Sequence, residues 1–178
     1  MRNLSILVLA ALTSLQIAKG EVKKEANAIA TAELLRGPIA SQQRKVITDT
    51  NTTRTIWSDG VILEITDSLP SEIQGLIDNT SYHTDLRTTI RRVQEELHAE
   101  YHPARLREKS RWEGHLEFET AAPQVNAFVN PVYVAYVQAR YPGCVALLKS
   151  KHDPVVFTVE GQIKVLLMPF KHPNDRTR

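Results

Sequence analysis

The chain has 178 residues, a single cysteine and a formal net charge of +2, from 22 Lys and Arg residues against 20 Asp and Glu residues. One cysteine excludes an internal disulfide, and so small an excess of charge excludes the strongly basic character of a general nucleic-acid binder. The length suits one domain with a sizeable hydrophobic core.

Residues 1–20 have the pattern of an export signal. Arg2 supplies the positive start, an apolar run follows, and Ala18-Lys19-Gly20 places small residues at the two positions that a signal peptidase reads. We expect cleavage before Glu21, which removes two basic residues and no acidic ones. The alternative is an uncleaved anchoring helix, but the run is shorter than a bilayer-spanning helix requires. The sequence therefore predicts a secreted chain that has no membrane association after cleavage.

Segment 21–43 leads into the predicted domain. Residues 21–36 place small and apolar side chains close to one helical face and end before Gly37-Pro38, which predicts an amphipathic helix. A flexible, alanine-rich lead segment is the alternative. Two N-glycan acceptor sequences begin at Asn51 and Asn79, each in a polar, turn-like stretch, and they matter only in a eukaryotic host.

A β-hairpin is predicted within residues 44–66. β-Branched residues fill both arms, and Asp59-Gly60 between them supplies the positive φ angles that a two-residue turn needs. Pro70 then stands where a short helical turn could begin. The domain is therefore expected to open with a hairpin, ahead of its main helix.

The clearest helix is predicted over residues 85–101. Its apolar residues recur at every third or fourth position and form one stripe, which comprises Leu86, Ile90, Val93, Leu97 and Tyr101. The opposite face is polar, and Pro103 marks the end of the helix. We expect the stripe to be part of the core.

The rest of the chain is typical of β-strands. Strands are predicted over residues 114–119, 131–138, 144–148, 155–159 and 163–168, with a tight turn at Glu160-Gly161 and a polar tail at 172–178. We therefore predict a single α+β domain over residues 44–171. It consists of a β-hairpin, one main amphipathic helix and then a mainly antiparallel sheet.

Three residues raise the question of metal or thiol chemistry. His98 and His102 lie four positions apart on the predicted helix, a spacing at which two histidines can bind one zinc ion. No third ligand has a recognisable spacing, so a pair of surface histidines is the alternative. Cys144 stands on a predicted strand and is interpreted as a buried apolar side chain, with a reactive thiol as the alternative. We predict no metal site and no cofactor.

A basic segment follows the predicted helix. Arg105, Arg107, Lys109 and Arg111 alternate along it, and Trp112 comes next. In an extended segment these four cations would share one side, ready for phosphates, with an aromatic ring available for stacking on a base. This predicts an RNA- or phosphate-binding site, while a solvated basic loop is the alternative.

The predicted strand over residues 114–119 carries the candidate catalytic residues. Its period of two places His115, Glu117 and Glu119 on one face and two apolar side chains on the core face. His115 and Glu117 could divide the roles of general acid and general base. An ordinary solvent-facing side of a strand is the alternative.

The C-terminal part resembles a known family. Asp153-Pro154-Val155-Val156-Phe157, followed by Gln162-Ile163, is similar to the penultimate-strand pattern of the small guanyl-specific ribonucleases of fungi. That family also runs in the order hairpin, one main helix, antiparallel sheet. Many small secreted effectors of plant-pathogenic fungi look like inactive relatives of it.

The same part of the chain departs from the family's pattern. The family has a phosphate-contacting arginine just before Val-Val-Phe, where this chain has Pro154. A histidine normally closes the following strand, whereas this chain reads Leu167-Met168-Pro169-Phe170, with His172 beyond. The family's disulfides are also absent. The resemblance therefore implies a degenerate active site and a binding role.

These observations predict a secreted, effector-like interaction protein without catalytic activity, a pseudoenzyme that acts in virulence as a monomer on a host or extracellular protein. One alternative is an RNA-binding or RNA-cleaving secreted protein that uses the basic segment and the strand of His115. The other is a metal-binding protein or metal-dependent enzyme that uses His98 and His102.

Overall fold

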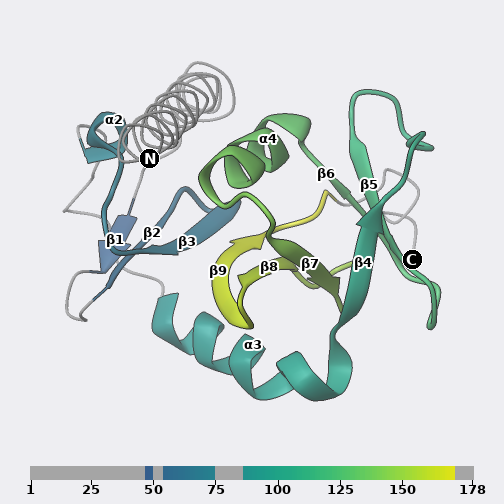
Figure 1. The fold of residues 1–178 in the computed structure, drawn as a ribbon, viewed down its shortest axis with the longest axis horizontal. Helices are drawn as coiled ribbons and strands as arrows, with labels where there is room; N and C mark the ends of the chain where they lie inside the picture. Colours follow the sequence, from purple (N-terminus) through teal and green to yellow (C-terminus); the bar gives the residue numbers. More distant parts are fainter. Residues whose placement is uncertain (1–46, 50–53, 75–85, 171–178) are drawn as a thin grey trace, which may run out of the picture.

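The computed structural model describes residues 47–49, 54–74 and 86–170 (Figure 1). The predicted export signal, the helix over 21–36, both glycan acceptor sequences and the polar tail lie outside these residues. No helix within the described ranges is long and apolar enough to cross a bilayer.

One antiparallel sheet organises the described residues. Its nine strands lie side by side in the order β1-β2-β3-β9-β8-β7-β4-β5-β6. In chain order they are β1 (Ile47–Asp49), β2 (Thr55–Ser58), β3 (Ile62–Thr66), β4 (His102–Leu106), β5 (Leu116–Thr120), β6 (Asn126–Val129), β7 (Val145–Leu148), β8 (Val155–Val159) and β9 (Gln162–Leu167). The helices are α2 (Ser71–Gln74), α3 (Leu86–Glu100) and α4 (Pro131–Arg140). The α+β class is therefore confirmed.

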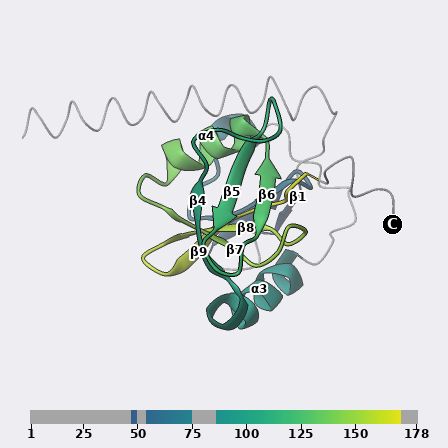
Figure 2. The same cartoon turned by 90° about the vertical axis from the view of Figure 1, so that its right-hand side faces the viewer.

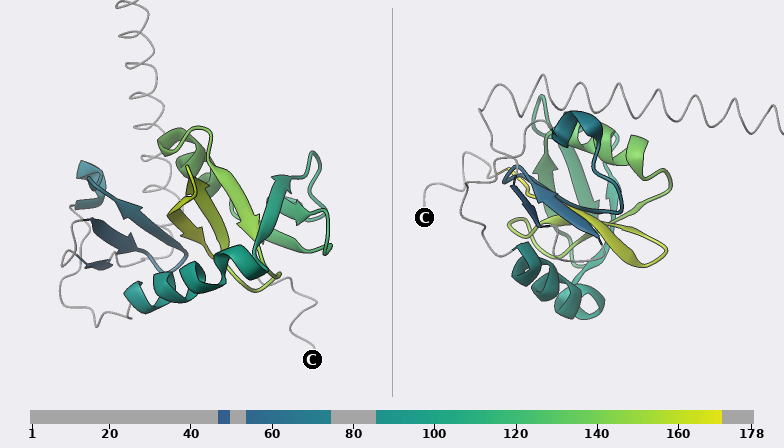
Figure 3. Two further views of the ribbon diagram at one scale, coloured as in Figure 1. Left: turned by 60° about the horizontal axis from the view of Figure 1, so that its bottom comes forward. Right: turned by 90° about the vertical axis from the view of Figure 1, so that its left-hand side faces the viewer.

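The sheet is covered by a helix on each face, and the views of Figures 1 and 3 agree on this arrangement. The buried residues accordingly fall into two clusters. Successive side chains of β8 point to opposite faces of the sheet and so contribute to both clusters. Val156 belongs to the cluster with α3, whereas Val155 and Phe157 belong to the cluster with α4. Residues 155–157 of β8 are buried on both faces of the sheet, which explains why this stretch is apolar without alternation.

Helix α3 confirms the predicted apolar stripe. All five of its residues are at most 8 % exposed, and Val93 is the most deeply buried of them. The helix ends at Glu100, ahead of Pro103, and β4 begins at His102. His98 and His102 therefore lie on different elements, and the prediction that they share one helical face is wrong.

The segment predicted as a strand over residues 131–138 is helix α4. The side chain of Asn130 caps it by accepting the backbone N–H of Val132 at 2.9 Å, and Pro131 occupies the first turn. The buried residues follow the helical pattern i, i+1, i+3, i+4 and form one face, which comprises Tyr133, Val134, Tyr136 and Val137. The valines favoured a strand by propensity, but the capped start and the burial of one helical face outweigh that weak preference.

The two predicted tight turns differ in the structure. Glu160 and Gly161 have φ angles of 51° and 74° and join the paired residues Val159 and Gln162, as a two-residue hairpin turn requires. In the first hairpin only Gly60 has a positive φ, of 88°. Asp59 is instead buried, where its Oδ1 accepts the backbone N–H groups of Val61 and Ile62. The two-residue turn predicted at Asp59-Gly60 is therefore wrong, because the pairing of Ser58 with Leu63 and the bond from the backbone N–H of Asp59 to the carbonyl of Ile62 at 3.3 Å centre the turn on Gly60 and Val61.

A buried carboxylate attaches α4 to the first hairpin. Glu64 on β3 is 0 % exposed and accepts hydrogen bonds from the hydroxyls of Tyr136 and Tyr141, each at 2.6 Å. It also accepts the indole N–H of Trp57 at 2.8 Å and the Nε of Arg140. Burial, reinforced by the carboxylate, raises the pKa of both tyrosines, so their hydroxyls remain protonated donors. Removing this acceptor would take away the hydrogen-bond partner of the buried Trp57 indole and Tyr136 hydroxyl.

Candidate functional site

A basic hollow lies along β4 and β5, next to the edge strand β6, and this end of the sheet faces the viewer in Figure 2. This first hollow has a volume of about 950 Å³. The residues that line it come mainly from β4, β5 and the connection between them, and include Arg105, Arg107, Lys109, Arg111, Glu119 and Gln124. All four cations of the predicted basic segment therefore border one cavity.

Strand pairing places these arginines opposite glutamates. Arg105 on β4 pairs with Glu119 on β5, and the backbone N–H of Arg107 donates to the carbonyl of Glu117 at 2.8 Å. Residues two apart on a strand share a face, so the two acidic and the two basic side chains lie on the same side of the ribbon. The arginines whose alternation suggested a phosphate site are thus paired with carboxylates of the neighbouring strand.

The outer ion pair is the more exposed one. Glu119 accepts the Nε of Arg105 at 3.1 Å and lies 3.4 Å from the Nη1 of Arg107. The side chain of Arg105 is 84 % exposed, whereas that of Glu119 is 15 % exposed. Because the arginine remains in water, we expect this pair to contribute little to stability.

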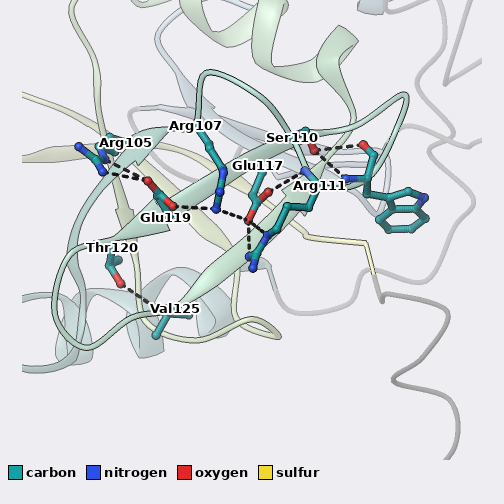
Figure 4. A network of polar contacts seen from close by, with 9 residues as sticks. Arg105, Arg107, Ser110, Arg111, Glu117, Glu119, Thr120 and Val125 are labelled. Atoms are coloured by element: carbon teal, nitrogen blue, oxygen red, sulfur yellow. Dashed lines mark hydrogen bonds and ion pairs between the residues drawn. The ribbon is translucent and has the colours of Figure 1, made fainter.

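The inner ion pair is centred on Glu117, which is 0 % exposed (Figure 4). Its carboxylate accepts the Nε of Arg111 at 2.8 Å, a second bond from Nη2, and the backbone N–H of Arg111 at 3.0 Å. In addition, Nη1 of Arg107 lies 3.8 Å from Oε1 of Glu117. Burial acts to raise the pKa of Glu117, but the hydrogen bonds and charge of Arg111 outweigh it, and the pKa is lowered. Glu117 is therefore a carboxylate at neutral pH.

The two candidate catalytic residues have separate surroundings. Phe118 faces the core as predicted, but Glu117 is buried too, so the alternative of an ordinary solvent-facing strand surface is wrong at residue 117. His115 precedes β5, and its ring stacks on Trp112 with centroids 3.8 Å apart and planes 16° apart. The structure therefore brings Glu117 to Arg111 and His115 to Trp112.

The predicted aromatic residue of the basic segment belongs to a small cluster. Besides its contact with His115, Trp112 meets the rings of Phe128 and Phe170 edge-on, at 5.7 and 6.2 Å between centroids. The imidazole covers one face of the indole ring. That face is therefore not available for stacking on a ligand.

Of the four predicted cations, Lys109 differs from the others. It is exposed at the rim of the first hollow, and within the described part of the chain no ion pair involves it. The Nη groups of Arg107 lie at longer distances from their carboxylates than those of Arg111. Lys109 is thus the cation most available to a ligand, and Arg107 is less firmly paired than Arg111.

A second hollow of about 590 Å³ adjoins the first. The two share Arg111 and Gln124, and the second is further lined by Val125, Asn126, Phe128 and Lys151. Sequence analysis missed this second group. Its members come from β6 and from the connections β5–β6 and β7–β8, which only the tertiary structure brings together.

Metal and thiol chemistry gain no geometric support within the described ranges. No group of three or more His, Cys, Asp or Glu residues there could hold a metal ion. Cys144 is half-buried, and burial raises the pKa of its thiol, which is the opposite of what a reactive thiolate needs.

No family model, no curated protein and no solved structure matches this chain. The resemblance to fungal guanyl-specific ribonucleases therefore remains a prediction. Val155, Val156 and Phe157, which carry it, lie on β8, and Pro154 just before them is buried.

Proposed function

We propose that this protein is a secreted, effector-like binding protein without catalytic activity, and that it binds an anionic partner at the first hollow. Its scaffold resembles that of the guanyl-specific ribonucleases in element order, with Pro154 in place of the phosphate-contacting arginine. The observation that carries the proposal is the buried carboxylate of Glu117, whose oxygens accept hydrogen bonds from Arg111.

Glu117 is suited to hold a cation in place and poorly suited to accept a proton. A general base works best when its pKa lies near the operating pH, whereas the pKa of Glu117 is lowered by Arg111. Its two oxygens already accept bonds from Arg111, which also raise the pKa of that guanidinium. The pair therefore supports a binding role, in which a fixed positive group borders a cavity.

The charges around the first hollow favour an anion. Arg105, Arg107, Lys109 and Arg111 line it, against the carboxylates of Glu108 and Glu119 and the buried Glu117 beneath. Positive charge exceeds negative charge at the opening, although the chain as a whole is nearly balanced. Such a local excess attracts anionic ligands and raises their association rate at low salt.

The test compares retention of three proteins on phosphocellulose as salt is raised. Lys109→Glu should elute at clearly lower salt than the unmodified chain, because it reverses a charge at the rim. Arg91→Glu changes the net charge equally on α3, outside both hollows, and should elute later than Lys109→Glu. Equal elution of the two variants would contradict a binding site at the hollow.

RNA is the second candidate ligand, because an arginine-rich segment with neighbouring aromatic rings is typical of RNA-binding surfaces. A cleavage assay with labelled single-stranded and structured RNA decides between binding and catalysis. We expect no turnover. Turnover that disappears in His115→Ala would contradict the non-catalytic proposal and favour a ribonuclease.

A further inference from the structure

We infer that the two hollows form one groove, and that its ligand is an acidic peptide segment of a protein partner. Its carboxylates would lie in the first hollow and an apolar side chain in the second. This inference rests on the proposed function and specifies the ligand class of the same site.

The groove is continuous because Arg111 and Gln124 line both hollows. It runs from the rim at Lys109, past Arg111, to Lys151 on the connection between β7 and β8. The two volumes of about 950 and 590 Å³ exceed the space that one small anion needs. A ligand with several groups along a chain can therefore contact both parts.

The first hollow is mixed in charge, and this favours a peptide over a nucleic acid. A nucleic-acid strand carries a negative charge on every nucleotide, and its phosphates would meet Glu108 and Glu119 as well as the cations. A peptide spaces its carboxylates and offers backbone N–H donors between them. Those donors can pair with Glu108 and Glu119, while Arg107 and Lys109 receive the carboxylates.

The second hollow supplies apolar surface and neutral amides. Val125 and Phe128 are half-buried, and the side chains of Gln124 and Asn126 stand beside them. An apolar side chain of the ligand can pack on Val125 and Phe128, while the two side-chain amides can form hydrogen bonds with a peptide backbone. Stacking of a base on Trp112 is disfavoured, because His115 covers one face of that ring.

Three charge-matched probes test the ligand class on the full chain at low salt, with binding followed by fluorescence anisotropy. They are polyglutamate, a copolymer of glutamate and phenylalanine, and polyuridylate. We expect the copolymer to bind about tenfold more tightly than polyglutamate, since burial of part of one phenylalanine ring is sufficient for that factor. The copolymer, which spaces its carboxylates, should also bind more tightly than polyuridylate.

Single substitutions test which hollow binds the carboxylates and which binds the apolar side chain. Lys109→Glu should weaken both peptides several-fold, whereas Arg91→Glu on α3 should leave the ratio between the probes unchanged. Val125→Asn should remove the advantage of the copolymer and keep the affinity for polyglutamate. Phe128→Ser repeats that test if Val125→Asn fails to fold, as judged by circular dichroism.

The outcomes separate the inference from the proposed function. Tighter binding of polyuridylate than of the copolymer would overturn the peptide inference and leave an anion-binding site in place. Equal affinity for the two peptides would overturn the role of the second hollow. Failure of all three probes to bind would overturn the proposed function as well.

Discussion

Two glutamates, Glu64 on β3 and Glu117 on β5, are each 0 % exposed and each paired with an arginine, yet their surroundings differ. Glu64 accepts bonds from an indole, two phenols and Arg140, whose side chain is only 20 % exposed. The partner of Glu117 is Arg111, whose side chain is 51 % exposed and borders a cavity.

The difference distinguishes a carboxylate that organises the core from one that organises a surface. Around Glu64 every donor belongs to the hairpin or to α4 and the residue that follows it, so its bonds hold two elements together. Around Glu117 the donors come from the same β4–β5 ribbon and turn a charge toward solvent. Burial of an acidic residue alone therefore does not distinguish the two positions, whereas the exposure of its arginine partner does.

The largest effect is expected from Glu64→Ala. The substitution removes the acceptor of the buried Trp57 indole and Tyr136 hydroxyl and the carboxylate that pairs with Arg140, and breaking a buried ion pair from one side costs about 3–5 kcal/mol. Denaturant unfolding monitored by tryptophan fluorescence measures the change. A loss below about 1 kcal/mol would show that α4 is held by apolar packing alone.

Glu117→Ala should cost less, about 1–3 kcal/mol, because Arg111 can turn into water once its partner is lost. The same unfolding experiment measures this change beside Glu64→Ala. If the two variants lose equal stability, the distinction between an enclosed and an open carboxylate does not hold.

The acid limit of stability should depend on Glu117. Its pKa in the folded chain lies below the usual value of 4.5. Its contribution is therefore present above that value and is lost as the pH falls through the lower folded pKa. Glu117→Gln should flatten the fall in unfolding free energy below about pH 5. An acid limb as steep as that of the unmodified chain would assign the loss to other carboxylates.

The alkaline limit should depend instead on the region around Glu64. Burial first, and then the charge of Glu64, raise the pKa of Tyr136 above its usual value of 10.0. The contribution of Tyr136 is therefore complete below that value and is lost as the pH rises toward the folded pKa. Tyr136→Phe should reduce the fall in melting temperature above about pH 10. An unchanged alkaline limb would contradict this assignment.

The smallest effect on stability is expected from Lys109→Glu. Lys109 is exposed, and no ion pair in the described ranges involves it, so the free energy of unfolding should change by no more than about 0.5 kcal/mol. Together with weaker anion binding, this result would separate the binding role of the rim from any role in folding. A loss comparable to that of Glu117→Ala would contradict the description of Lys109 as a rim residue.

Much of the fold could be predicted because its signals are local. The stripe from Leu86 to Tyr101 repeats at the helical period, and Glu160-Gly161 carries the residues of a two-residue turn. The strand predicted over 131–138 failed because β-branched residues outweighed the helix start at Asn130-Pro131. Among the site residues, the four cations alternate visibly in the sequence, whereas nothing local marks Gln124, Phe128 or Lys151 as their neighbours.

By itself, the sequence determined the α+β class, the buried face of α3 and the row of cations from Arg105 to Arg111. The tertiary structure alone decided which acidic residues are buried and what they bind. A glutamate on an alternating strand faces water or protein according to the elements packed against that face, which lie far away along the chain. Glu64 lies 76 positions from Arg140, and only folding brings the two together.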